Sequence, residues 1–330
     1  MSLRITATVE RWPVAGQFII ARGAKTFVDV LVVAVSDGAH FGYGEGTAIY
    51  YRNETAEGCL GQVERIIGQL EPLTVQDARA LTQILLGGGA ARNALDCALW
   101  DLESKATGTM LWQLAGLSAA PKPVQTAFTI SLGDAAAMEA DAAKAAAKGF
   151  GLLKLKLTGE GDRGRVAAVR RGAPDARLII DANESWSRLD IAAEAAILAD
   201  IGVEMIEQPV PAGQDAMLAD VRAPLPVIAD ESCHDSSDVA RLAPYYDGIN
   251  VKLDKAGGLT EALKIIEHAR AAGLKTMVGC MLSTSLGVAP AFLLAQHADW
   301  VDLDGPGLLE QDRPNGFTFA DGTIIASANG

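Results

Sequence analysis

The stretch GLLKLKL, residues 151–157, places two lysines, Lys154 and Lys156, inside an apolar run. Side chains of a β-strand alternate between two faces, so residues two apart point the same way. We therefore expect both lysines on one face of a strand and the leucines on the other. Two like charges on a strand of a packed core need a chemical reason, which the flanking sequence supplies.

Short apolar stretches recur after residue 115, and amphipathic segments separate them. The expected strands are VQTAFTI, GLLKLKL, ARLIIDAN, VEMIEQP, LPVIADES, GINVKLD, LKTMVGC and WVDLDG. Seven helical segments are expected between them, among them AMLADVRAP and LTEALKIIEHARAAG. Eight strands that alternate with helices predict an α/β protein with a TIM-type barrel.

The first part of the chain has a different pattern. RITATVERWPV and FVDVLVVAVSDGAHFGYGEGTA predict antiparallel strands, and segments with helical spacing follow them. We expect an α+β domain over residues 1–115 and the barrel over residues 116–312. The tail, residues 313–330, contains a Pro-Asn-Gly turn and short β runs.

Composition argues against several classes of protein. The 330 residues are 49% hydrophobic and 21% charged, an ordinary balance for a folded protein. A net charge of −13 argues against nucleic-acid binding, which needs basic patches. The four cysteines form no CxxC pair and are expected to be reduced thiols of a cytoplasmic protein. No signal peptide is evident, and no apolar run reaches the roughly 18 residues of a membrane span.

Polar residues stand at the carboxyl ends of five consecutive expected strands. They are Lys156, Asp181, Glu207, Asp230 and Lys252. Successive members lie 22 to 26 positions apart, which is the length of one strand–helix unit. Because the carboxyl end of such a barrel carries the active site, we expect all five side chains at one mouth.

The three central carboxylates predict a metal site. Asp181, Glu207 and Asp230 would repel one another when ionised, and a divalent cation removes that cost. Oxygen ligands without His or Cys favour Mg²⁺ over Zn²⁺. A single acid at a strand end is more often a solvated loop residue, but three in succession favour a site.

The flanking lysines are candidate bases. Lys154 raises the local positive potential, so we expect Lys156 to lose its proton more easily. Lys252 comes from the opposite side of the ring. Two bases on opposite faces of a substrate can remove a proton from one face and return one to the other. Mg²⁺ would stabilise the enediolate that forms next to the substrate carboxylate.

Together these motifs resemble the enolase superfamily, in its muconate-lactonizing-enzyme subgroup. The likeness covers nearly the whole chain and rests on KLK, the strands DAN, IEQP and ADES, and NVKLDKAGGL. It implies a modified (β/α)7β barrel and a capping domain built from both chain ends, to which residues 313–330 would return. The site residues implied are the metal ligands Asp181, Glu207 and Asp230, the bases Lys156 and Lys252, and the helper Lys154.

A further motif distinguishes reactions within this subgroup. Asp302 and Asp304 lie two apart in WVDLDG, at the mouth of the last strand, and would share a face. Two acids there suit an ammonium group. A DxD at this place is associated with dipeptide epimerases, where it holds the free N-terminus of the substrate. Muconate and the o-succinylbenzoate precursor have no ammonium group.

The loops FIIARGAK and AIYYRNET resemble the capping-domain loops of L-Ala-D/L-Glu epimerases. The resemblance implies that Arg22, with Arg52 as a second candidate, pairs with a glutamate side chain, which Arg can do in a bidentate way. Supporting residues are expected at strand ends. They are Thr129, Met281 and Ser283 lining the pocket, Asn183 orienting a ligand or a metal-bound water, and Glu231 bonded to a neighbouring lysine.

The resemblance therefore implies a Mg²⁺-dependent enzyme that interconverts L-Ala-L-Glu and L-Ala-D-Glu, as in murein-peptide recycling. Relatives are often homo-oligomers, so a homo-oligomer is one assembly that the resemblance allows. Three alternatives remain open. The protein could be a dipeptide epimerase of other specificity, a cycloisomerase or o-succinylbenzoate synthase of the same subgroup, or an inactive barrel that only binds peptides or metal. The intact lysine pair argues against the last, because binding alone needs no base on both faces.

Overall fold

Eight parallel strands form the central sheet of the computed structural model, which describes residues 2–20 and 23–327. In ring order they are β5 (Phe128–Ile130), β6 (Leu152–Lys156), β7 (Arg177–Asp181), β8 (Val203–Glu207), β9 (Val227–Ala229), β10 (Gly248–Lys252), β11 (Lys275–Gly279) and β12 (Trp300–Asp302). The Ala127 N–H donates to the Val301 carbonyl at 2.8 Å, which brings the two end strands together. The sheet thus nearly closes, and the predicted barrel is confirmed.

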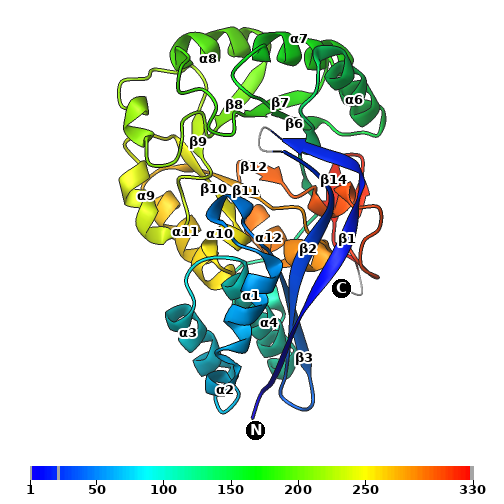
Figure 1. Cartoon of the computed structure of the whole chain (residues 1–330), viewed down its shortest axis with the longest axis vertical. Helices are drawn as coiled ribbons and strands as arrows, with labels where there is room; N and C mark the ends of the chain where they lie inside the picture. The colour runs from blue at the N-terminus through cyan, green and yellow to red at the C-terminus, as the bar shows by residue number, and fades with distance from the viewer. Residues whose placement is uncertain (1, 21–22, 328–330) are drawn as a thin grey trace.

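Helices cover the outside of this barrel (Figure 1). They are α6 (Ala135–Ala147), α7 (Asp162–Gly172), α8 (Ile191–Asp200), α9 (Ser236–Leu242), α10 (Leu253–Ala256), α11 (Leu259–Ala271) and α12 (Ser285–Ala295). The predicted helix AMLADVRAP is wrong, because only a 3₁₀ turn forms there, η2 (Asp215–Leu218), ahead of Pro224 and Pro226. A second 3₁₀ turn, η3 (Gly305–Leu308), follows β12 in place of a full helix.

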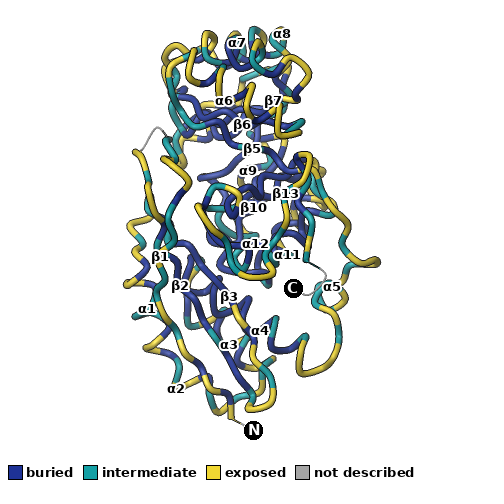
Figure 2. The backbone as a smooth tube through the Cα atoms, turned by 90° about the vertical axis from the view of Figure 1, so that its right-hand side faces the viewer, coloured by how far each residue is buried: buried dark blue, intermediate teal, exposed yellow. Residues whose placement is uncertain are grey.

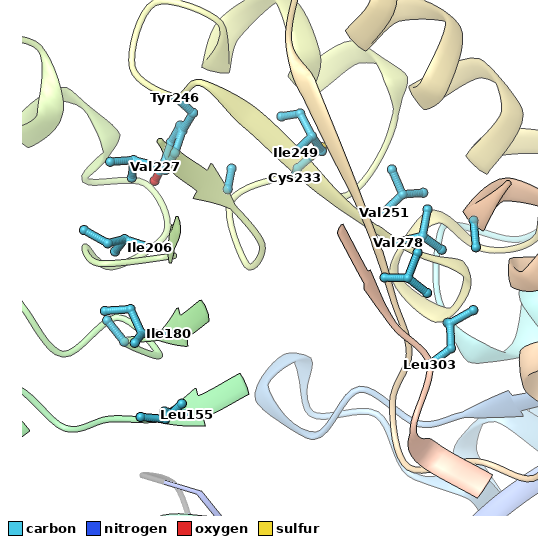
Figure 3. Packing of buried hydrophobic residues seen from close by; sticks show 14 of the residues in the cluster. Leu155, Ile180, Ile206, Val227, Cys233, Tyr246, Ile249, Val251, Val278 and Leu303 are labelled. Atoms are coloured by element: carbon cyan, nitrogen blue, oxygen red, sulfur yellow. The ribbon is translucent and has the colours of Figure 1, made fainter. Parts of the chain in front are cut away.

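Alternation along the strands divides their side chains into two layers. Leu153 and Leu155 belong to the cluster between sheet and helices, where Figure 3 shows Leu155, Ile180 and Ile206 on successive strands. Leu152 departs from the prediction, because its place in the alternation puts it on the inner face with the lysines. It closes the barrel floor, which consists of Ala127, Leu152, Ile179, Met205, Ile228, Met277 and Trp300. Farther along each strand, polar side chains replace this apolar layer.

The first part of the chain forms an α+β module beside the barrel (Figure 1). Its elements are the antiparallel strands β1 (Arg4–Ile20), β2 (Gly23–Ser36) and β3 (Phe41–Thr47), the turn η1 (Tyr50–Arg52), and the helices α1 (Ala56–Glu64), α2 (Ile67–Leu70), α3 (Val75–Leu85), α4 (Ala90–Thr107) and α5 (Leu111–Leu114). One face of β2 packs on these helices and the other on Leu282 and Leu309. Figure 2 shows buried residues both in the barrel strands and in this module.

Three glycines let α4 approach β3 closely. A β-carbon on Gly42, Gly44 or Gly46 would lie 2.1 to 2.2 Å from a carbonyl oxygen of α4, so only glycine fits. The amino-terminal half of α4 also contacts the barrel domain. There Arg92 donates to the carbonyl oxygens of Ala256, the last residue of α10, and of Gly257, which follows it.

The carboxyl-terminal segment contacts two different neighbours. Arg313 donates to Glu10 at 2.7 Å and to Glu45 at 2.9 Å, both in the first module. The hairpin of β13 (Thr318–Ala320) and β14 (Thr323–Ile325) instead pairs with β4 (Val124–Gln125), which splits off from the first predicted barrel strand. The implied return of all of residues 313–330 to the capping module thus needs correction, because β4 provides the pairing edge.

A buried carboxylate links the two parts of the molecule. Asp254 on α10 accepts the Thr47 N–H at 2.8 Å and the Asn93 amide at 2.9 Å. Burial, with Glu54 and Glu45 nearby, raises the pKa of Asp254 to about 7. The folded protein thus binds this proton more tightly than the unfolded chain does. The stability gained from protonation is complete below about pH 4 and is lost as the pH rises through about 7.

We expect Asp254→Asn to remove this pH dependence, because asparagine can still accept both hydrogen bonds but does not ionise. The difference in free energy of unfolding, variant minus natural protein, should therefore be about 2 kcal/mol larger at pH 8 than at pH 5. Urea unfolding at both pH values measures it. A difference between the two proteins that stays constant with pH would contradict the assignment.

Candidate active site

The polar residues predicted from the strand ends meet inside the carboxyl end of the barrel. Carboxylate oxygens of Asp181, Glu207 and Asp230 lie within 4.8 Å of one another, and all three residues are buried. Lys156 Nζ lies 2.6 Å from Asp181 Oδ2, and Lys252 Nζ lies 2.6 Å from Asp230 Oδ2. Because β6 and β10 stand four strands apart in the ring of eight, the two lysines enter from opposite sides.

Lys154 is fully buried among carboxylates. Its Nζ lies 2.6 Å from Glu207 Oε2, 2.8 Å from Asp302 Oδ2 and 3.6 Å from Asp181 Oδ2. Burial disfavours its charged form, but Asp302, Glu207 and Asp181 together outweigh burial and raise its pKa well above the ordinary value. Lys154 therefore stays charged and supplies fixed positive potential at the centre of the site.

The charge balance around Lys252 differs from the one expected for a base in this site. Burial favours its neutral form, but Asp230 and Glu207 outweigh burial and the repulsion from Lys154, and they raise the pKa of Lys252 well above its ordinary value. The carboxylates around Lys252 thus favour its charged form. A cation bound among those carboxylates would weaken their effect on the lysine.

The predicted repulsion among the acids is evident at Glu207. Burial and the Asp181 carboxylate raise the pKa of Glu207 to about 7. Burial also opposes the charge of Asp230, but Lys252 and Lys255 hold its pKa well below the usual range. Glu207 Oε2 and Asp230 Oδ1 are buried without an aligned hydrogen-bond donor among the described residues, although lysine nitrogens lie close. Such oxygens, with no His or Cys in the group, fit a hard divalent cation.

Two residues that were not predicted complete the site. Lys255 Nζ lies 2.5 Å from Asp230 Oδ1, and Asn250 donates to Glu207 Oε1 at 2.6 Å. Asn250 precedes Lys252 by two positions on β10, so alternation alone would have indicated it. Lys255 lies beyond the strand on α10, and its direction depends on the turn between them.

The DxD acids line the same cavity as the three lysines. Asp302 Oδ2 pairs with Lys154, whereas Asp302 Oδ1 is buried with no hydrogen-bond partner among the described residues. Asp304, which precedes η3, accepts the Thr129 N–H at 2.7 Å. Burial and the nearby Asp302 raise the pKa of Asp304 to about 7. A cationic group in the cavity would relieve this repulsion, and Thr129 lines the cavity as predicted.

The capping module contributes to the cavity through the β1–β2 hairpin. Phe18 lines it together with the predicted Met281. The hairpin is anchored at the mouth by the Leu132 N–H, which donates to the Ile19 carbonyl at 3.0 Å. Arg22, predicted on this hairpin, lies outside the described residues.

Two other predicted residues do not line the cavity, and a third contacts Asp181. Arg52 is exposed on η1 and does not line this cavity, and Ser283 is buried with its hydroxyl turned back to the Met281 carbonyl at 3.2 Å. Asn183 orients Asp181 through its main-chain N–H, which lies 2.9 Å from Asp181 Oδ1.

Glu231 is buried, and the structure places it near the capping module. Burial chiefly raises the pKa of the Tyr51 phenol, and the nearby carboxylates of Asp230 and Glu231 raise it further. Tyr51 is thus a capping-module residue close to the three clustered carboxylates that was not predicted. No periodic pattern in the sequence would have indicated it, because η1 is a short turn.

A barrel that carries three acids between opposed lysines, with a capping α+β module, is the architecture of the enolase superfamily. The family model for the mandelate racemase / muconate lactonizing enzyme N-terminal domain matches residues 3–116. The model described as enolase C-terminal domain-like matches residues 137–329. The chain belongs to this family of isomerases, the mandelate racemase / muconate lactonizing enzyme family.

Individual relatives are similar over nearly the full chain. The L-Ala-D/L-Glu epimerase of Escherichia coli K12 is 42% identical, covering 96% of this chain and 97% of the relative. An enolase family member from Agrobacterium tumefaciens with homology to dipeptide epimerases, solved with bound sodium and L-Ala-L-Glu, is 44% identical with a TM-score of 0.93 over 98% of both chains. The dipeptide epimerase of Enterococcus faecalis V583, complexed with Mg and L-Leu-L-Tyr, is 30% identical with a TM-score of 0.91, covering 99% of this chain and 98% of that one.

None of the helices within residues 2–20 and 23–327 is long and apolar enough to cross a membrane.

Proposed function

We propose that this protein is a Mg²⁺-dependent dipeptide epimerase that interconverts L-Ala-L-Glu and L-Ala-D-Glu, with murein-peptide recycling as its context. The observation that carries the proposal is the placement of Lys156 and Lys252 on opposite sides of three clustered carboxylates. The names and bound dipeptides of the relatives support the substrate class. The DxD acids in the same cavity support a substrate with a free ammonium group.

Asp181, Glu207 and Asp230 would hold the Mg²⁺ ion, which offsets the negative charge that develops on the substrate carboxylate. One of the two bases, Lys156 or Lys252, removes the α-proton of the second residue. The other donates a proton to the opposite face, which inverts that carbon. The order of the two lysines is reversed for the opposite epimer.

The remaining residues orient the substrate. Asp302 and Asp304 accept hydrogen bonds from its ammonium group, while Lys154 balances the charge of Asp302 and Glu207. We propose Arg22 as the partner of the glutamate carboxylate, on the basis of the sequence resemblance. Phe18, four positions before Arg22, lines the cavity, which supports a role for this hairpin in specificity.

Proton exchange in D₂O tests the proposal directly. The protein is incubated with Mg²⁺ and L-Ala-L-Glu, and NMR follows deuterium at the glutamate α-carbon and the appearance of L-Ala-D-Glu. A folded, Mg²⁺-binding protein that exchanges no proton would contradict the proposed substrate. A panel of dipeptides that vary the second residue then distinguishes this epimerase from one of other specificity.

We expect Asp304→Asn to lower kcat/KM for L-Ala-L-Glu about 100-fold, because the ammonium group loses a buried charged partner worth roughly 3 kcal/mol. Asparagine can still accept the Thr129 N–H, so the local fold should persist. The loss should appear mainly in KM and should be absent for any slow turnover of N-acetyl-L-glutamate, which has no ammonium group. Unchanged kinetics with L-Ala-L-Glu would show that Asp304 does not bind the ammonium group.

A further inference from the structure

Gln208 follows the proposed metal ligand Glu207 and is fully buried. Its backbone φ is 37°, in the left-handed region that side-chain-bearing residues rarely adopt. Such a conformation costs free energy and persists where the surrounding contacts enforce it. The contacts of this one residue are therefore informative.

Both ends of the Gln208 side-chain amide are fully used. Its Oε1 accepts the Asp230 N–H at 2.8 Å and the Ser232 N–H at 3.2 Å. Its Nε2 donates to the Val210 carbonyl at 2.7 Å, to Ser232 Oγ at 2.9 Å and to Tyr246 Oη at 3.0 Å. An amide offers two N–H donors and one oxygen that can accept two hydrogen bonds, so two of the three acceptors around Nε2 share one hydrogen. The site therefore matches the polar atoms of this side chain and not its volume alone.

The main chain of Gln208 extends the connection to a third strand. Its carbonyl accepts the Glu184 N–H at 2.8 Å, in the loop that follows β7 and Asp181. Its own N–H donates to the Ile228 carbonyl of β9 at 2.9 Å. One residue thus bridges the ends of the three strands that carry the three acids.

Regular sheet pairing does not reach far enough to make this connection. β8 and β9 pair only at Ile206 with Val227 and at Glu207 with Ile228. Asp230 lies two residues beyond the last paired position of β9. The hydrogen bond from the main-chain N–H of Asp230 to Gln208 Oε1 takes the place of a backbone hydrogen bond between the strands. It therefore fixes the position of Asp230 relative to Glu207.

The same network is anchored away from the cavity. Ser232 Oγ and Tyr246 Oη donate to Asp215 Oδ1 at 2.5 and 2.8 Å. Arg241 donates to Asp215 Oδ2 at 2.9 Å. These hydrogen bonds connect the Gln208 amide to Asp215 and Arg241, neither of which lines the cavity.

We infer that Gln208 is a positioning residue that sets the spacing of Glu207 and Asp230 for the cation. Mg²⁺ demands near-ideal geometry from its ligands, so a small displacement of one carboxylate weakens binding. The inference rests on the proposed function, because it takes the three acids to be the Mg²⁺ ligands. Gln208 itself contacts neither the carboxylate oxygens of the proposed ligands nor the cavity.

The test is Mg²⁺ affinity measured by isothermal titration calorimetry on the full-length protein. Gln208→Met keeps the approximate length and volume but removes the polar atoms, and we expect its Mg²⁺ affinity to fall 10- to 100-fold. Exchange of the substrate α-proton should recover largely at saturating Mg²⁺. Tyr246→Phe is the matched control, because it removes one acceptor of Nε2 and leaves the Asp230 bond intact; its Mg²⁺ affinity should stay within about threefold of the natural protein.

A folded Gln208→Met protein with unchanged Mg²⁺ affinity would overturn the inference, even if its Tm is lower, because a merely structural residue gives that result. If this variant does not fold, Gln208→Asn decides in its place, since its amide is one methylene too short to reach the Asp230 N–H. Hydrogen exchange in the natural, metal-free protein gives an independent result: an Asp230 amide that exchanges as fast as an exposed loop would also overturn it. If the natural protein binds no Mg²⁺, the proposed function fails instead.

Discussion

Lys156→Ala and Lys252→Ala should each reduce epimerisation by about 10³-fold in both directions, because inversion needs a base on each face. Deuterium exchange should separate the two variants. Each should lose exchange with the epimer whose α-proton faces the missing lysine. Each should retain, within about tenfold, exchange with the opposite epimer, whose proton faces the remaining lysine. NMR of separate L-Ala-L-Glu and L-Ala-D-Glu samples in D₂O measures all four rates.

The predicted difference between the two epimers follows from the positions of β6 and β10 on opposite sides of the barrel. Lys144→Ala is the matched control, because Lys144 is an exposed lysine of α6 that pairs only with Asp141 among the described residues. It should leave all four rates unchanged. Equal loss of exchange with both epimers in either active-site variant would argue against two bases and for one lysine that serves both faces.

Glu207→Gln should abolish measurable turnover and weaken Mg²⁺ binding by more than about 100-fold, because it removes one of three charged ligands from a buried site. Glutamine can still accept the Asn250 amide hydrogen bond that Glu207 Oε1 receives, so the fold should survive. A thermal shift gives a readout other than activity. Mg²⁺ at 100 times its Kd should stabilise the natural protein by about 2.7 kcal/mol and the variant by almost nothing.

Glu160→Gln, which changes an exposed acid outside the site, should keep both turnover and the Mg²⁺-dependent shift. Calorimetry with Mg²⁺ and melting with and without it are the measurements. If Glu207→Gln were stabilised by Mg²⁺ as strongly as the natural protein, the three acids would not be the metal site. A chelator should lower the Tm of the natural protein and of the Glu160 variant alike.

Much of the barrel and of the candidate site could be predicted from local pattern. Alternation put Lys154 and Lys156 on the inner face, and spacing by one strand–helix unit put Asp181, Glu207 and Asp230 side by side. These predictions succeed because the order of strands around a parallel barrel follows the order of the chain. Residues on one face at successive strand ends must then be neighbours.

The sequence by itself thus determined which strands form the barrel and which acids and lysines face its mouth. Only the tertiary structure decided how far each side chain reaches beyond its strand. Gln208 turns back on a left-handed backbone, Lys255 extends from a helical turn to Asp230, and Phe18 comes from a hairpin more than 100 residues before the first acid. The pairing of the terminal hairpin with β4 likewise depends on the tertiary structure. Such placements depend on turn conformations and on contacts between distant segments, neither of which has a local period.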